Sequence, residues 1–182
     1  MAEITDIPLK TIEGKDATLG DYAGKVLLVV NVASKCGLTP QYEALEALYK
    51  DKRDAGLTVL GFPANNFRGQ EPGTEAEIAD FCSTTYGVDF PLFQKISVVG
   101  DDQHPLYGAL TKAKPDAEGD GPMRERLAGH GIDVAPKPNI VWNFEKFLIN
   151  RKGAVVGRFA PDVPPSDERI TKAIDKALAE PA

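Results

Sequence analysis

Two cysteines are the residues of this chain best suited to chemistry, and Cys36 has the more informative surroundings. It follows an apolar run, Val26–Val30, which is typical of a strand buried on both faces of a parallel sheet. Thr39 and Pro40 come next and favour the start of a helix, as N-cap and first helical residue. The N-terminus of a helix carries unpaired N–H groups and partial positive charge, which favour a thiolate, as does the adjacent Lys35. Because the thiolate is the nucleophile, the sequence predicts chemistry at Cys36.

The alternative for either cysteine is a small, buried, unreactive residue. Cys82 shares the apolar face of a predicted helix with Ile78 and Phe81, so its pattern alone indicates core packing. Neither cysteine belongs to a Cys-x-x-Cys pair or a zinc-like cluster, and the chain has two histidines. The sequence therefore predicts no metal site and no cofactor.

Composition and charge narrow the classes of function. The net charge of −6 argues against nucleic acid or an anionic membrane as partner, because both attract basic surfaces. No apolar run is long enough for a membrane span, and residues 1–20 lack the pattern of a secretory signal. We therefore expect a cytoplasmic protein. In that reducing compartment, two cysteines indicate catalysis or transient redox chemistry more than a structural disulfide.

The elements that would position Cys36 alternate between strands and helices. Helical periodicity, a Thr74–Glu77 capping box and terminal glycines predict helices over 40–55, 75–86, 105–112 and 166–179. Apolar runs predict strands over 26–30, 57–62, 144–149 and 155–159, with shorter extended pieces at 90–93 and 96–99. An N-terminal hairpin is expected from 4–9 and 17–19, followed by one helical turn over 19–22.

This order indicates a single α/β domain over residues 1–182, with three layers and a central mixed β-sheet. The strands over 144–149 and 155–159 form an antiparallel hairpin at its end. Residues 113–138 are rich in Gly, Pro, Asp and Ala and interrupt the pattern. We interpret them as a surface insertion, because strand-like segments resume after it.

Three stretches resemble one known family. NVASKCGLTPQY at 31–42, LGFPANNFRGQEPG at 60–73 and WNFEKFLINRKG at 142–153 resemble the glutathione peroxidase family in sequence, order and spacing. The form is similar to the cysteine-containing, thioredoxin-dependent bacterial branch. The resemblance implies a thioredoxin-like fold and the reduction of hydrogen peroxide and organic hydroperoxides.

The resemblance also implies roles for particular residues. Cys36 takes the position of the peroxidatic nucleophile, and Gln70, Trp142 and Asn143 complete a catalytic tetrad. Their own patterns indicate only a solvated loop residue, a core aromatic and a turn residue. Their neutral N–H donors nevertheless suit the task, because peroxide cleavage develops negative charge on the departing oxygen. The product on the sulfur is a sulfenic acid, which condenses with a second thiol.

The second thiol is Cys82, which matches the resolving position of some members. Many cysteine-based members carry a further Cys where this chain has Ala64, so Cys82 is the one intramolecular candidate. A disulfide needs Cα atoms within about 7 Å, so we expect the helix over 75–86 to unwind partly before Cys82 reacts.

Several functions remain open from the sequence. The first is a thiol peroxidase that is recycled by thioredoxin, as a monomer or weak dimer. Glutathione as the reductant, a peroxide sensor that passes its disulfide to a partner protein, and a structural role with inert thiols are the alternatives. A copper-chaperone variant is disfavoured, because CGLTP at 36–40 has no second nearby cysteine.

Overall fold

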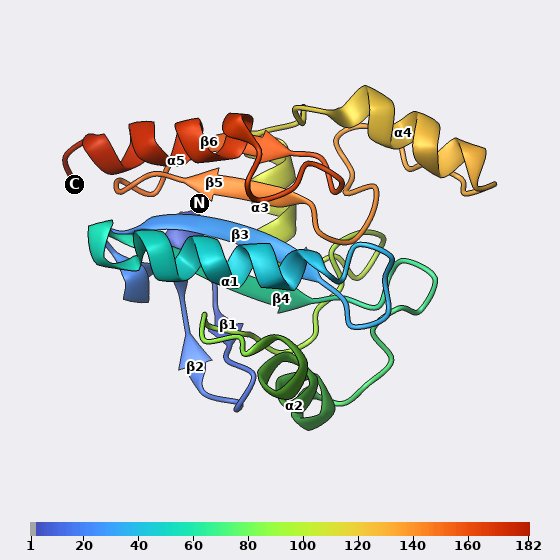
Figure 1. Cartoon of the computed structure of the whole chain (residues 1–182), viewed down its shortest axis with the longest axis horizontal. Helices are drawn as coiled ribbons and strands as arrows, with labels where there is room; N and C mark the ends of the chain where they lie inside the picture. The colour runs from blue at the N-terminus through green and yellow to red at the C-terminus, as the bar shows by residue number, and fades with distance from the viewer. Residues whose placement is uncertain (1–2) are drawn as a thin grey trace.

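A four-stranded mixed sheet forms the centre of the computed structural model, which describes residues 3–182 (Figure 1). Its strands are β3 (Val26–Val32), β4 (Leu57–Pro63), β5 (Lys146–Ile149) and β6 (Val155–Phe159). They lie in the order β4-β3-β5-β6, with β3 parallel to β4 and antiparallel to β5, and with β5 antiparallel to β6. The predicted mixed sheet and its C-terminal hairpin are therefore confirmed.

Strand β3 is buried along its whole length and divides the core in two. Its side chains at 26, 28, 30 and 32 belong to one hydrophobic cluster, and those at 27 and 29 to the other. This alternation follows from the two-residue period of a strand, which places successive side chains on opposite faces. A continuous apolar run is thus the sequence signature of a strand covered on both faces.

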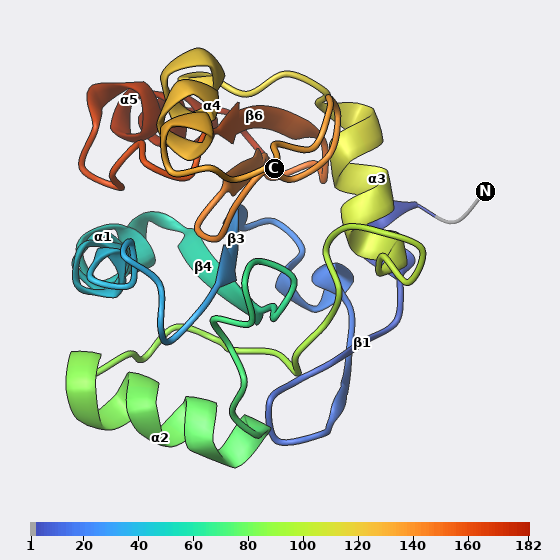
Figure 2. The same ribbon diagram turned by 90° about the vertical axis from the view of Figure 1, so that its right-hand side faces the viewer.

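Helices cover both faces and complete the three layers (Figure 2). The helices are α1 (Gln41–Lys52), α2 (Glu75–Tyr86), α3 (Pro105–Ala113), α4 (Asp120–Gly129) and α5 (Glu168–Ala179). Helices α1 and α5 pack on one face, and α3 packs on the other with the N-terminal segment. Helix α2 has the predicted bounds, with the Thr74–Glu77 capping box at its start and Gly87 in the left-handed conformation at its end.

The short elements agree in part with the sequence analysis. They are the strands β1 (Leu9–Lys10) and β2 (Asp16–Ala17) and the 3-10 turns η1 (Ile4–Asp6), η2 (Leu19–Tyr22) and η3 (Arg53–Ala55). The predicted helix over 40–55 is therefore a shorter α1 continued by η3, and Gly56 closes it. The piece at 96–99, predicted as extended, is not part of a strand. Ile96 N donates to the carbonyl of Pro63 at the end of β4, and Val98 N donates to Oδ1 of Asn66 in the loop that follows.

The segment 113–138 contains α4, a helix that the sequence analysis did not predict. Gly129 and Pro122 lie within it, so its composition is that of a loop. Met123 and Leu127 are one turn apart on α4 and both are buried in the core. Within residues 3–182, no helix is both long enough and apolar enough to cross a membrane.

Candidate active site

Cys36 lies in the loop that joins β3 to α1. Its side chain is 8% exposed, and the backbone N–H of Leu38 donates to its Sγ at 3.3 Å. Thr39 Oγ1 accepts the N–H of Cys36 at 2.9 Å and donates to Ala33 O at 2.8 Å. The hydroxyl of Thr39 therefore holds the cysteine loop, and Thr39 is not the helix cap that the sequence predicted. Helix α1 starts one residue later than expected, with Pro40 at the N-cap position.

Gln70 lies in the loop after β4 and packs next to the loop that carries Cys36. Its carbonyl accepts the N–H of Lys35 at 3.0 Å, which ties the two loops together. Asn143 Nδ2 donates to Gln70 Oε1 at 3.0 Å. Because the acceptor end of the Gln70 amide is thereby engaged, its two N–H donors are left for the cavity in front of it. Asn143 itself is fully buried and stands behind Gln70.

Asn31 positions the stretch that carries Trp142 and Asn143. Its Nδ2 donates to Trp142 O at 3.1 Å, and its own carbonyl accepts the N–H of Phe144 at 2.6 Å. Phe144 has a φ of 69°, a conformation that bulky residues avoid and that surrounding contacts must enforce. The sequence analysis ended the strand at Val30 and overlooked Asn31. The available signal was a polar residue directly after an apolar run.

These segments enclose a cavity of about 350 Å³, which we call the thiol cavity. It is lined by Cys36, Gly37, Leu38, Arg68, Gln70, Met123, Arg126, Leu127, His130, Ile132 and Trp142. Three of the four predicted tetrad residues thus face one space, and Asn143 reaches it through Gln70. The Trp142 ring packs on Phe67 with centroids 5.5 Å apart. Helix α4 and the residues after it form a wall that the sequence analysis did not foresee.

The thiol cavity combines a sulfur, neutral hydrogen-bond donors and positive charge. Gln70, with its amide, and Trp142, with its indole, line the cavity. The N–H of Leu38 donates to the sulfur of Cys36. Arg68 and Arg126 add positive charge to the lining. Such a site can hold a sulfur anion and stabilise an oxygen anion that leaves it.

Cys82 lies elsewhere, in the middle of α2. It is 1% exposed, is absent from the lining of the thiol cavity, and both cysteines are free thiols. Burial raises the pKa of the Cys82 thiol to about 11, although the Tyr42 hydroxyl beside it acts in the opposite direction. The structure therefore does not bring Cys82 into the space that Cys36, Gln70 and Trp142 share.

Comparison with known proteins shows the family to which this chain belongs. The sequence profile of the glutathione peroxidase family matches residues 4–111. The chain is 49% identical over 174 residues to the thioredoxin/glutathione peroxidase BtuE of Escherichia coli K12, covering 94% of this chain and 95% of that protein. It is 47% identical over 167 residues to the hydroperoxy fatty acid reductase gpx1 of Synechocystis, covering 92% and 90%.

A solved structure extends the likeness to the fold. The crystal structure of Trgpx in apo form superposes with a TM-score of 0.72 at 37% identity, covering 100% of this chain and 99% of that one. The fold is thioredoxin-like, as expected from the sequence. By profile, sequence and structure, this chain belongs to the glutathione peroxidase family and is a peroxidase, an oxidoreductase.

Proposed function

We propose that this protein reduces hydroperoxides with Cys36 as nucleophile and is recycled through Cys82 by a thioredoxin-like protein. The observation that carries the proposal is the thiol cavity, where Cys36 faces the donors of Gln70 and Trp142. In the first step the Cys36 sulfur bonds to one peroxide oxygen and the O–O bond breaks. The other oxygen leaves with the bonding electrons and takes up a proton, as water or an alcohol. Cys36 becomes a sulfenic acid.

Each polar group has a part in that step. The N–H groups of Gln70 and Trp142 stabilise the charge on the departing oxygen, which preorganised donors in a water-poor site do effectively. Asn143 is a positioning residue, since its bond to Gln70 Oε1 keeps the amide from turning over. The N–H of Leu38 donates to the sulfur, and this bond strengthens when the sulfur is charged.

The lining of the thiol cavity favours organic hydroperoxides in addition to hydrogen peroxide. Leu38, Met123, Leu127 and Ile132 supply apolar surface, while Arg68 and Arg126 supply positive charge. A hydroperoxide with an apolar chain and a terminal carboxylate would contact both the apolar surface and the arginines. The name of the Synechocystis relative, a hydroperoxy fatty acid reductase, supports this substrate class.

In the second step the Cys82 sulfur attacks the Cys36 sulfur, the S–O bond breaks and water leaves. A disulfide remains, and a dithiol protein reduces it. The burial of Cys82 in α2 implies that residues 75–86 open first, and faster amide exchange of that helix in the oxidised protein would support this. The cytoplasmic location and the monomeric or weakly dimeric state stay predictions.

The same burial favours a second candidate, in which glutathione reacts with the sulfenic acid directly. Peroxide consumption driven by thioredoxin and its reductase, compared with glutathione and its reductase, separates the two. We expect faster turnover with thioredoxin, and Cys82→Ser should lose it while Cys36 is still oxidised and then proceeds to the sulfinic acid.

Peptide mapping under non-reducing conditions is the direct check. A Cys36–Cys82 linkage after one equivalent of peroxide supports the proposal. If no linkage forms and glutathione sustains turnover in both the parent and Cys82→Ser, resolution is external and the second candidate holds.

A further inference from the structure

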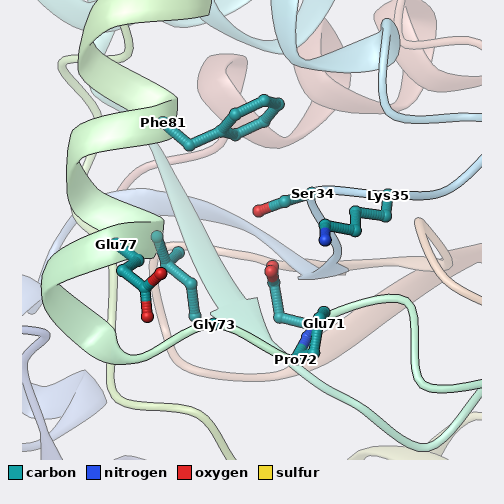
Figure 3. A pocket seen from close by; sticks show the side chains of 8 residues that line it. Ser34, Lys35, Glu71, Pro72, Gly73, Glu77 and Phe81 are labelled. Carbon is teal, nitrogen blue, oxygen red and sulfur yellow. The ribbon is translucent and has the colours of Figure 1, made fainter.

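A second cavity of about 260 Å³ lies between the two segments that carry the cysteines. It is lined by Ser34, Lys35, Glu71, Pro72, Gly73, Glu77, Ile78 and Phe81, and we call it the glutamate cavity (Figure 3). Ser34 and Lys35 directly precede Cys36 in the chain, while Ile78 and Phe81 lie in the turn of α2 before Cys82. A side chain leaving α2 for the cysteine loop would enter this space.

Glu71 is the unusual residue of the glutamate cavity. It is 1% exposed, yet neither oxygen of its carboxyl group has a hydrogen-bond partner among residues 3–182. The hydroxyl of Ser34 is likewise buried without a partner, and Figure 3 shows the two groups pointing toward each other across the cavity. Burying an unpaired carboxyl group is costly, so such a group requires an explanation.

No basic side chain among residues 3–182 forms an ion pair with the carboxyl group of Glu71. The titratable groups around it come from four segments of the chain and are Lys35, Tyr42, Glu77, Cys82 and Lys95. Glu77 accepts the N–H of Thr74, and Lys95 Nζ donates to Gly73 O, so both are engaged elsewhere. Burial raises the pKa of Glu71, and the nearby hydroxyl and backbone N–H of Ser34, followed by the positive charges of Lys95 and Lys35, offset this in part.

Cys82 and Glu71 influence each other although they are on different segments. The negative charge of Glu71 adds to the burial that raises the pKa of Cys82. In the reduced protein Cys82 therefore holds its proton, and an acceptor is needed before its sulfur can attack. The Glu71 carboxyl group, which lines the cavity between the two cysteine-bearing segments and raises the pKa of Cys82, is such an acceptor.

We propose that Glu71 accepts the proton of Cys82 during disulfide formation and that the glutamate cavity is the space in which this transfer occurs. The inference rests on the proposed function, because it assigns a base to the resolving step. When α2 opens, Cys82 enters the cavity, its S–H proton passes to Glu71 and its sulfur bonds to the Cys36 sulfur. The S–O bond breaks, and the departing hydroxide takes up a proton to leave as water. No other oxidant or reductant is required.

The test separates the two steps by the fluorescence of Trp142, which is the single tryptophan of the chain and lines the thiol cavity. Stopped-flow mixing with hydrogen peroxide should give a peroxide-dependent phase for sulfenic acid formation and a peroxide-independent phase for resolution. In Glu71→Gln we expect the first phase within about twofold of the parent and the second slowed about tenfold or more.

The pH profile of the second phase distinguishes a base from a structural role. In the parent, the resolving rate should rise with pH as Glu71 loses its proton, above the range of an ordinary carboxyl group. Glu71→Gln should lose this rise and retain only the rise that the Cys82 thiol imposes at high pH. Glu71→Asp keeps a carboxyl group and should recover part of the rate and the profile, which provides a second variant should Glu71→Gln fold poorly.

Glu77→Gln is the matched control, because it removes a carboxylate from the same cavity while glutamine still serves in a capping box. Its second phase should match that of the parent. Equal slowing in Glu77→Gln and Glu71→Gln, or an unchanged second phase in Glu71→Gln with the Cys36–Cys82 linkage intact, overturns the inference alone. Slowing of the first phase in Glu71→Gln would make the residue a support for Gln70 and also overturns it. Absence of the linkage in the parent overturns the proposed function itself.

Discussion

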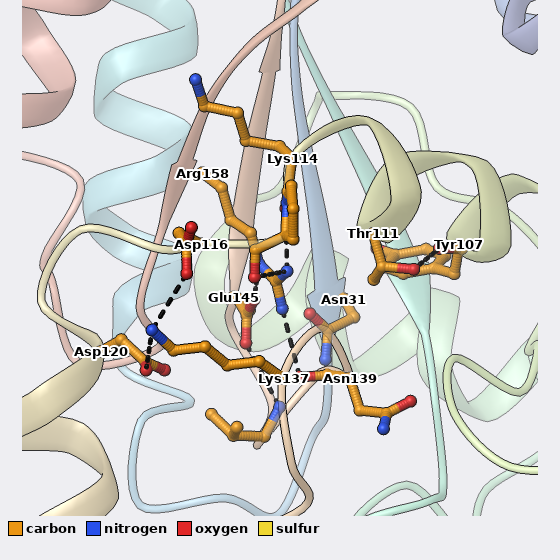
Figure 4. Close-up of polar contacts among 12 residues, drawn as sticks. Asn31, Tyr107, Thr111, Lys114, Asp116, Asp120, Lys137, Asn139, Glu145 and Arg158 are labelled. Atoms are coloured by element: carbon orange, nitrogen blue, oxygen red, sulfur yellow. Dashed lines mark hydrogen bonds and ion pairs between the residues drawn. The ribbon is translucent and has the colours of Figure 1, made fainter.

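Two buried glutamates, Glu145 and Glu71, differ in whether a basic side chain is paired with the carboxyl group. Glu145 lies at the start of β5 and forms an ion pair with Arg158 of β6, and both are at most 3% exposed (Figure 4). The other oxygen of Glu145 accepts the N–H of Val141 at 3.3 Å. The Arg158 guanidinium also donates to Lys114 O, Pro115 O and Asn139 O. In contrast, Glu71 is equally buried, and among residues 3–182 no basic side chain forms an ion pair with it.

The difference separates structural polar groups from reactive ones. Arg158 binds Lys114 O and Asn139 O, at the two ends of the segment 113–138, which places α4 beside the thiol cavity. Burial still raises the pKa of Glu145, and Arg158 offsets this in part. Neither residue lines the thiol cavity, so we interpret the pair as specifying the geometry. Around Cys36 and Glu71, polar atoms are left with capacity to bind or to move a proton. Five substitutions test this contrast.

The largest expected effect is that of Cys36→Ser on activity. A serine hydroxyl is not ionised near neutral pH, so peroxide turnover should fall to the rate without enzyme. The change is nearly isosteric, so the melting temperature should stay within a few degrees. Turnover within a few-fold of the parent would remove Cys36 from the mechanism and the thiol cavity from the reactive side of the contrast.

Arg158→Met should produce the reverse result, a large loss of stability without a direct effect on chemistry. Removing one partner of a buried ion pair leaves the other charge uncompensated, which typically costs about 3–5 kcal/mol. The free energy of unfolding in urea is the measurement. Lys172→Met, which breaks the exposed pair of Lys172 with Glu168, is the control and should cost less than about 1 kcal/mol. Similar losses in both variants would contradict a special role for the buried pair.

Gln70→Ala and Asn143→Ala refine the contrast within the reactive region. Loss of an anion-stabilising donor should slow oxidation of Cys36 by at least about tenfold, measured by stopped flow. Asn143→Ala should slow it less than Gln70→Ala, because Asn143 acts through the Gln70 amide. The opposite order would indicate that Asn143 contacts the peroxide itself.

The smallest expected effect is a gain in stability in Glu71→Gln. The pKa of Glu71 is raised in the folded protein, so the unfolded chain releases this proton at lower pH than the folded protein does. Stability of the parent therefore falls as pH rises from about 4.3, the ordinary glutamate value, to the raised folded value, and stays lower above it. Glutamine carries no charge, so the variant should exceed the parent in stability at pH 7 and match it near pH 4. A loss of stability at pH 7 would mean that Glu71 is compensated like Glu145.

Much of this architecture follows from local pattern. The apolar runs in β3 and β4 predict buried strands because seven consecutive buried positions leave no polar face. The bounds of α2 follow from a capping box and a terminal glycine, which act within one turn of the chain. Cys36 at the end of a strand is equally a local feature. Its neighbours Gln70, Trp142 and Asn143 were predicted through the family resemblance and not through their own patterns.

The features that escaped prediction depend on long-range contacts. Helix α4 has a loop-like composition, and its fold is held by two buried side chains and by the anchoring of its flanks on Arg158. Thr39 resembles a helix cap in the sequence. Its hydroxyl instead donates to the carbonyl of Ala33 and accepts the N–H of Cys36. Asn31 acts through partners more than 110 positions away in the chain.

The sequence by itself determined the family and the order of strands and helices, and it singled out the thiol that we propose to react. Periodicity and caps are local features, and motifs are compared directly between sequences. Only the tertiary structure decided which side chains share a cavity, which buried charge is paired and which is free. Glu145 precedes an apolar strand and Glu71 lies in a Gly-Pro-rich loop, but neither local setting reveals whether the carboxylate gains a basic partner. The distinction arises because β6 brings Arg158 to the first, whereas no basic side chain among residues 3–182 forms an ion pair with the second.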